Sequence, residues 1–165
     1  MANYCSNRIV FAGSKAAIQK IQVLFDTLRQ QEDQTGKGQL PDFVSREEGY
    51  FLDLYWDGGD VGTFQYETRW APNTEVVKEI ADHYKVGFTL DYEELGNLVY
   101  GKVTYSRGQL LDVYLEPEDF DRYELDFETG IYHFEGQPYE YDCEILEMLL
   151  ERKIQKNTVS SNPQH

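Results

Sequence analysis

Cysteine is scarce in this sequence, which has Cys5 and Cys143 and no others among its 165 residues. Two cysteines so far apart are too few for the disulfide framework of a small secreted domain, so we expect free thiols in a reducing compartment. Long apolar runs are missing as well, because no stretch approaches the roughly 18 apolar residues of a membrane span. The N-terminus lacks the pattern of a signal peptide. The sequence therefore predicts a soluble, cytoplasmic protein with no membrane partner.

Basic residues are also few. The sequence has 15 Lys and Arg against 30 Asp and Glu, which gives a formal net charge of −15. The imbalance is local: residues 112–151 hold 14 of the acids and one base, Arg122. Nucleic acids and anionic membranes require positive charge near phosphate, so direct binding to either is not expected. One interpretation of the acidic segment is a surface that only keeps the protein in solution. The other is a recognition surface for a basic partner protein, formed by Asp112, Glu116, Glu118, Asp119, Asp121, Glu124, Asp126 and Glu128.

Motifs for catalysis, metal binding or nucleotide binding are also missing. Gly36-Lys37-Gly38 lacks the spacing of a phosphate-binding loop. A calcium loop that began at Asp119 would need glycine in place of Glu124 and a glutamate in place of Gly130. None of the three histidines is spaced with Cys or carboxylate residues as a zinc site requires; they are His83, His133 and His165. We therefore predict no catalytic residue, no metal site and no cofactor.

The sequence does contain a regular apolar pattern. A period of two predicts strands at 4–12, 50–56 and 64–70 and a fourth that begins at Val86, and a period of 3.6 predicts helices at 15–31 and from Pro72 to Tyr84. Ser14 is the expected N-cap of the first helix. Asp57 and Asp60 flank a Gly-Gly turn and are expected to be turn residues, not metal ligands. The order β-α-β-β-α-β predicts an α+β fold with two helices on one face of a four-stranded antiparallel sheet.

The last third of the sequence continues this pattern. It predicts a hairpin at 97–115, a further hairpin at 123–134 and a last helix at 142–155. Residues 157–165 have nothing to bury and are expected to be disordered. We therefore predict a single domain over residues 1–156, with its core and the first added hairpin at 3–110 and an acidic hairpin and helix region at 111–156.

Three short segments resemble the YubB family, which is encoded by bacteriophages, plasmids and conjugative elements of bacteria. The resemblance covers about residues 3–110, so the acidic segment falls outside it. It rests on the segment from Asn3 through Tyr4, Cys5 and Ser6 to Asn7, on Trp70 and Pro72 before a helix, and on Tyr92, Glu93, Gly96 and Gly101. It implies a ferredoxin-like domain and a mobile-element context in which the basic partner would be a host protein. It implies no activity and no catalytic residue.

The residues of these segments also have structural interpretations. Trp70 shares its phase with Phe64 and is expected in the core, and Glu93 is expected to accept hydrogen bonds from turn amides. Cys5 lies among apolar strand residues and is expected to pack there. The alternative is an enzyme with a site between sheet and helices formed by Tyr92, Glu93 and Cys5. We predict that the protein acts by binding and not by catalysis.

Overall fold

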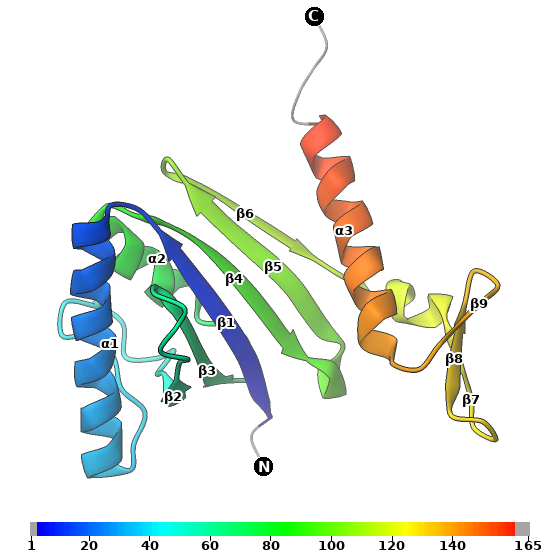
Figure 1. Ribbon diagram of the computed structural model, residues 1–165, viewed down its shortest axis with the longest axis horizontal. Coiled ribbons are helices and arrows are strands. Elements are labelled where there is room, and N and C mark those ends of the chain that lie inside the picture. The colour runs from blue at the N-terminus through cyan, green and yellow to red at the C-terminus, as the bar shows by residue number, and fades with distance from the viewer. Residues whose placement is uncertain (1–2, 161–165) are drawn as a thin grey trace, which may run out of the picture.

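The computed structural model describes residues 3–160, which form an antiparallel six-stranded sheet, a small second sheet and three α-helices (Figure 1). The strand order in the large sheet is β2-β3-β1-β4-β5-β6, and the small sheet has the order β7-β8-β9. This α+β architecture confirms the predicted class. The first six elements are β1 (Tyr4–Ala12), α1 (Lys15–Thr35), β2 (Leu52–Tyr55), β3 (Thr63–Arg69), α2 (Thr74–Tyr84) and β4 (Gly87–Glu94).

The main core lies between one face of the large sheet and the helices α1 and α2. Ser14 accepts a hydrogen bond from the Ala17 amide at 3.1 Å and so begins α1 as predicted. The ring of Phe25 on α1 stacks on that of Phe64 on β3 with centroids 4.0 Å apart. The strands contribute alternate residues to this core, among them Cys5, Ile9 and Phe11 from β1, Phe64 and Tyr66 from β3, and Phe88, Leu90 and Tyr92 from β4. Alternate burial follows from the pleat of each strand.

Strand β2 departs from the predicted alternation. The pattern placed Leu52 and Leu54 on one face with Phe51 opposite, whereas Phe51 and Leu54 are both buried. Asp53 has φ +50°, and the register with β3 shifts between Leu52 and Tyr55. The prediction was wrong because such a bulge changes which face the following side chains occupy.

Trp70 is not a core residue, contrary to the prediction. Its phase with Phe64 and Tyr66 would point it inward only if the strand continued, but β3 ends at Arg69. Trp70 has φ +68° and its side chain is 54% exposed. A residue in the left-handed region leaves the pleat, so the alternation of faces stops there. Thr68 is the last buried residue of β3.

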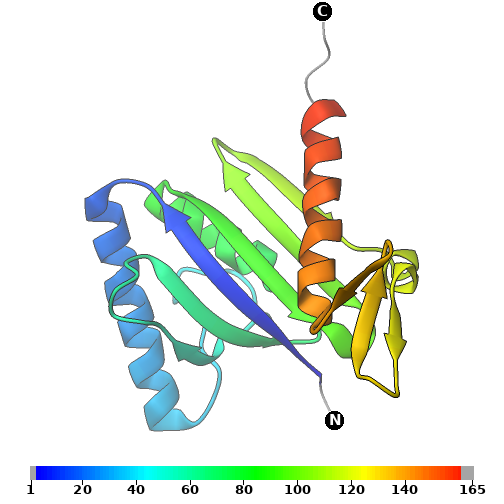
Figure 2. The same cartoon turned by 45° about the vertical axis from the view of Figure 1, so that its right-hand side comes forward.

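The C-terminal third extends the sheet and builds a second core on its opposite face. β5 (Val99–Ser106) and β6 (Gln109–Tyr114) follow β4 after a 3₁₀ turn at Leu95–Asn97. α3 (Asp142–Ser160) stands against the β5–β6 side of the sheet (Figure 2). This second core contains Val113, Leu115, Phe134, Ile145, Leu146, Leu149 and Leu150.

The acidic segment forms more structure than the sequence predicted. A 3₁₀ helix at Pro117–Arg122 leads into β7 (Glu124–Asp126), β8 (Ile131–Phe134) and β9 (Gln137–Tyr139). The predicted hairpin at 123–134 therefore has a third strand, which pairs with β8. Residues 157–160, predicted to be disordered, belong to α3. Residues 161–165 lie outside the described part of the chain.

Candidate functional site

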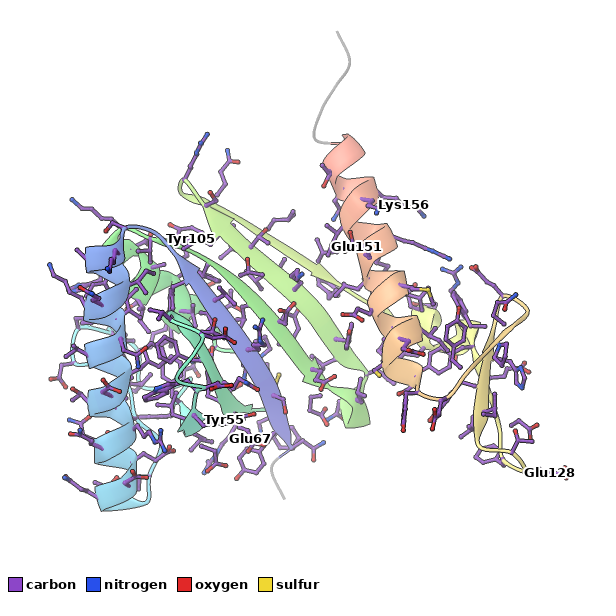
Figure 3. The ribbon with its side chains drawn as sticks, viewed as in Figure 1. Tyr55, Glu67, Tyr105, Glu128, Glu151 and Lys156 are labelled. Atoms are coloured by element: carbon purple, nitrogen blue, oxygen red, sulfur yellow. The ribbon has the colours of Figure 1, made fainter. Side chains whose placement is uncertain are left out.

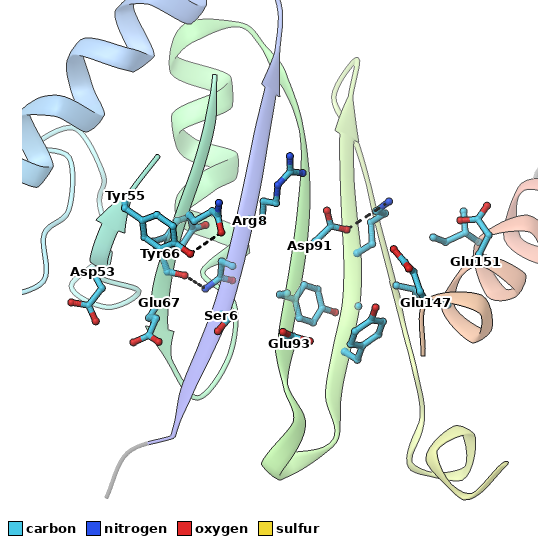
Figure 4. Close-up of a pocket in the computed structure, with 18 residues that line it drawn as sticks. Ser6, Arg8, Asp53, Tyr55, Tyr66, Glu67, Asp91, Glu93, Glu147 and Glu151 are labelled. Carbon is cyan, nitrogen blue, oxygen red and sulfur yellow. Dashed lines mark hydrogen bonds and ion pairs between the residues drawn. The ribbon is translucent and has the colours of Figure 1, made fainter. Parts of the chain in front are cut away.

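The sheet leaves part of one face uncovered. α1 and α2 cover the face that carries Leu90, and α3 covers the other face only at its β5–β6 side. Between α3 and the uncovered strands lies a cavity of about 580 Å³, which we call the trough (Figure 4). Its volume falls within the range of about 300–1,000 Å³ that is usual for ligand sites.

Cross-strand pairing places residues that are distant in sequence side by side along the floor of the trough. Arg8 on β1 lies between Gln65 on β3 and Asp91 on β4. The neighbouring row is Glu67, Ser6 and Glu93, and β5 continues the two rows with Lys102 and Tyr100. Pairing partners in adjacent strands point to the same face of a sheet. Residues from four strands therefore line one continuous surface.

The lining of the trough is strongly acidic. Its carboxylates are Asp53, Glu67, Asp91, Glu93, Glu147 and Glu151, and its cationic side chains are Arg8 and Lys102. Lys102 is paired with Asp91, with 3.6 Å between Nζ and Oδ1. Glu147 and Glu151 extend from α3 towards the sheet (Figure 4). The excess of negative charge is therefore built by tertiary structure, from β2, β3, β4 and α3 together.

Two carboxylates lie close together at the β2 side of the trough. Burial raises the pKa of Glu67 above its ordinary value, and the charge of Asp53 together with a hydrogen bond between the two groups raises it further. Two like charges at short distance each disfavour ionisation of the other. The pair is thus a place where a positive charge would be stabilised.

Tyr100 occupies the opposite side, where the sheet meets α3. Burial, followed by the charges of Glu147 and Glu93, raises the pKa of Tyr100 to about 12. The phenol therefore stays neutral near neutral pH and offers a hydroxyl and an aromatic face beside the carboxylates. An aromatic face attracts cations such as lysine and arginine side chains.

The eight acids predicted as a partner surface are divided by the structure. Three of them have structural partners: Asp112 accepts from the Tyr92 hydroxyl at 2.7 Å, Asp119 pairs with Lys153 at 2.6 Å, and Asp126 accepts from the Glu128 amide at 2.9 Å. Glu116 and Asp119 cap the 3₁₀ helix as a reciprocal pair. The remaining four, Glu118, Asp121, Glu124 and Glu128, are exposed around the small sheet and do not line the trough.

The structure separates the residues of the alternative enzyme site. Cys5 is fully buried on the α1–α2 side, and burial raises the pKa of its thiol to about 11. Tyr92 packs in the same core and also lines part of the trough, whereas Glu93 pairs with Ser6 and points to the trough. A thiol with a raised pKa is a poor nucleophile at neutral pH. Cys5 does not line the trough, so the three side chains do not meet in one cavity.

The other residues of the three short segments have structural roles, with one correction. Glu94, and not Glu93, binds a turn amide, because its carboxylate accepts from the Asn97 amide at 2.9 Å. A Cβ on Gly96 would come within 2.8 Å of the Glu94 carboxylate. The Asn3 carbonyl accepts from the Trp70 amide at 2.8 Å.

Two further residues of these segments, Pro72 and Asn7, also have structural roles. Pro72 precedes the N-cap residue Asn73, two positions before the first residue of α2. The buried amide of Asn7 donates to the Thr68 hydroxyl at 2.9 Å and so links β1 to β3.

The sequence interpretation missed Asp53, Glu67 and Asp91 as members of a site. Glu67 and Asp91 alternate with buried residues, so the strand pattern already placed them on the wet face. Their convergence could not be read from the sequence because it depends on which strands are neighbours. Among residues 3–160, no group of three or more His, Cys, Asp or Glu side chains is arranged to hold a metal ion. No helix in that range is long and apolar enough to cross a membrane.

Comparison with known protein families gives a match to part of the chain. A family model described as a ferredoxin-like domain in Api92-like protein matches residues 51–135, slightly more than half of the chain. The match covers β2 to β8 and leaves out β1 and α1, and it includes residues 111–135 of the acidic segment. The resemblance to the YubB family, by contrast, was expected to cover about residues 3–110 and not that segment. No curated protein and no solved structure matches the chain.

Proposed function

The chain belongs to the family described as the ferredoxin-like domain in Api92-like protein, and from that premise we propose that it acts by binding, with the trough as a recognition surface for a basic protein segment. The family description names a fold and no activity, so the proposal depends on the site. The observation that carries it is the convergence of six carboxylates, from four elements, on one concave surface.

The distribution of these carboxylates favours a segment with several positive charges over a single ion. They lie on both sides of the trough, across strands that are about 4.8 Å apart. Asp53 and Glu67 flank one side, and Glu147 and Glu151 flank the other. Lysine and arginine side chains are long enough to reach such groups from an extended or helical backbone. Charge-assisted hydrogen bonds to carboxylates then provide affinity, and complementary charge speeds association.

The resemblance to the YubB family supplies the biological setting of the proposal. A protein of bacterial mobile elements acts inside a host, so the partner we propose is a cytoplasmic host protein with a basic surface. Surfaces built to bind nucleic acid have the required density of Lys and Arg. The negative charge of the trough makes direct binding of nucleic acid unfavourable.

The test compares two variants with the same net charge. The trough variant carries Glu67→Gln, Glu93→Gln, Glu147→Gln and Glu151→Gln. The tip variant carries Glu118→Gln, Asp121→Asn, Glu124→Gln and Glu128→Gln, on exposed positions of the acidic segment. Figure 3 shows Glu128 at the far end of the small sheet, away from Glu67 and Glu151. The probe is a fluorescein-labelled hexalysine peptide, and anisotropy is measured at several salt concentrations.

We expect the trough variant to bind the probe at least tenfold more weakly than the parent, about 1.4 kcal/mol, and the tip variant to bind like the parent. Binding by the parent should weaken as salt shortens the Debye length from about 10 Å at 0.1 M to about 3 Å at 1 M. An equal loss of affinity in both variants would mean that binding of the probe depends only on the net charge of the protein. A loss of affinity in the tip variant alone would mean that the acids at 112–128, and not the trough, bind the probe. Circular dichroism and melting curves confirm that both variants fold.

A further inference from the structure

A second cavity of about 1,100 Å³ lies at the end of β3, beside the trough. We call it the Trp70 hollow. Its apolar lining includes Trp70, Tyr4, Tyr50, Leu52 and Pro72. The three aromatic side chains are all exposed, with Tyr4 at 47%, Tyr50 at 44% and Trp70 at 54%. Tryptophan and tyrosine are the residues most enriched where protein partners bind tightly.

The position of Trp70 is fixed by its neighbours. Its amide donates to the Asn3 carbonyl at 2.8 Å, which continues the pairing of β1 and β3 beyond Tyr4 and Arg69. The Ala71 amide donates to the Arg69 carbonyl at 2.8 Å, and the Thr68 hydroxyl donates to the Ala71 carbonyl at 2.7 Å. A non-glycine residue in the left-handed region is disfavoured and persists only where the surrounding structure enforces it. These bonds enforce it and hold the indole outward.

The hollow adjoins the trough along β1, β2 and β3. Tyr4 of the hollow and Ser6 of the trough are alternate residues of β1, and Arg69 and Glu67 are alternate residues of β3. Alternate residues of a strand share a face and lie about 7 Å apart. Leu52 of the hollow directly precedes Asp53 of the trough. One bound segment can therefore contact both cavities.

The hollow differs from the trough in charge. Its cationic side chains, Lys37, Arg46 and Arg69, are matched by Glu47, Glu48 and Glu75. Arg46 lies 3.6 Å from both Glu75 and Glu79. A hollow without an excess of either charge selects its occupant by apolar and aromatic contact.

We propose that the Trp70 hollow is an anchor subsite of the binding surface and takes an apolar or aromatic side chain next to the basic residues of the same partner segment. This inference rests on the proposed function of the trough, because the charge there defines the rest of the segment. The path from β3 to β5 crosses three strand spacings, about 14 Å, and an extended chain covers that distance with about five residues. The segment is therefore a short basic stretch with an aromatic residue at one end.

The test uses fluorescein-labelled hexalysine peptides that carry a Gly-Trp extension at the N-terminal or the C-terminal end. Matched peptides carry Gly-Ala at the same position. The proteins are the parent, Trp70→Ala, and Phe127→Ala as a control, because Phe127 is 90% exposed in the β7–β8 turn and distant from the hollow. Melting curves accompany the titrations, and Trp70→Ala is expected to stay folded because the side chain packs in no core.

We expect one of the two tryptophan peptides to bind the parent at least threefold more tightly than its matched alanine peptide. A gain of this size lies within the range of interaction energies of two aromatic side chains. In Trp70→Ala the ratio of the two affinities should fall to about one, and in Phe127→Ala it should equal that of the parent. Salt-sensitive binding of all peptides with no preference for tryptophan would overturn the anchor subsite and leave the trough proposal standing. A preference that survives in Trp70→Ala would also overturn it. Failure of every peptide to bind would overturn both proposals.

Discussion

Replacing Gly101 by alanine should destabilise the protein through Tyr92. Gly101 on β5 pairs with Tyr92 on β4, and the tyrosine ring lies over the glycine. A Cβ at this position would overlap the Tyr92 hydroxyl and lie 2.5 Å from Cζ of the ring and 2.9 Å from Cβ of Tyr114. Tyr92 is buried and its hydroxyl donates to Asp112 at 2.7 Å, so the ring cannot move without breaking that bond.

Two effects determine how much stability Gly101→Ala should lose. Inserting a methyl group into a packed region costs about 1–3 kcal/mol. A hydrogen bond to a charged group contributes about 1.5–3 kcal/mol, and the exposed Asp112 carboxylate puts this one at the lower end. We therefore expect Gly101→Ala to lower the free energy of unfolding by about 2–4 kcal/mol. For a chain of 165 residues this corresponds to a fall in melting temperature of roughly 6–12 °C.

The assay is urea denaturation of the parent, Gly101→Ala and a matched control, Gly58→Ala. A Cβ on Gly58 would have no neighbour within 4 Å, so the control should stay within about 0.5 kcal/mol of the parent. Tyr92→Phe removes the hydroxyl, which is the atom nearest the added methyl group. The double variant should therefore lose less than the sum of the single losses, with a coupling of about 1 kcal/mol. A loss below about 0.5 kcal/mol for Gly101→Ala would refute the packing argument.

Two further predictions concern ionisable groups. The raised pKa of Glu67 means that the folded protein holds its proton more tightly than the unfolded chain, so stability falls as the pH rises from about 4.3 through the folded-state pKa. Glu67→Gln should then raise the melting temperature near neutral pH and leave it unchanged near about pH 3, and an equal effect at both would contradict the assignment. For Asp119, burial acts to raise the pKa, but hydrogen bonds from Lys153 and the Glu116 amide outweigh it and leave the pKa lowered. Asp119→Ala should lower the free energy of unfolding by about 1–2 kcal/mol at neutral pH in urea titrations, with the exposed Asp121→Ala as control. The difference in stability between the parent and Asp119→Ala should disappear as the pH falls below about 3.9, the ordinary pKa of an aspartate. A difference that is constant with pH would count against the ion pair.

Elements that form for local reasons could be predicted from the sequence. The period of two in β1 and β4 predicted which residues face the core, and Ser14 predicted the start of α1, because pleat and cap geometry depend on near neighbours in the chain. The net charge and its concentration in one segment were also readable without a structure. The same pattern failed at Asp53 and Trp70, since one residue with positive φ changes the face of those that follow and leaves no trace in the apolar periodicity.

The candidate site, in contrast, depends on contacts between segments that are distant in the sequence. Glu67 and Glu93 become neighbours of Ser6 because β1 lies between β3 and β4, and Glu147 joins them because α3 packs on Val113 and Leu115. Strand order and helix docking depend on contacts between distant segments, which local periodicity does not encode. Some acids of the predicted partner surface instead have partners within the protein, because Asp112 binds Tyr92 and Asp119 binds Lys153. The trough therefore exists because the fold gathers carboxylates that the sequence keeps apart.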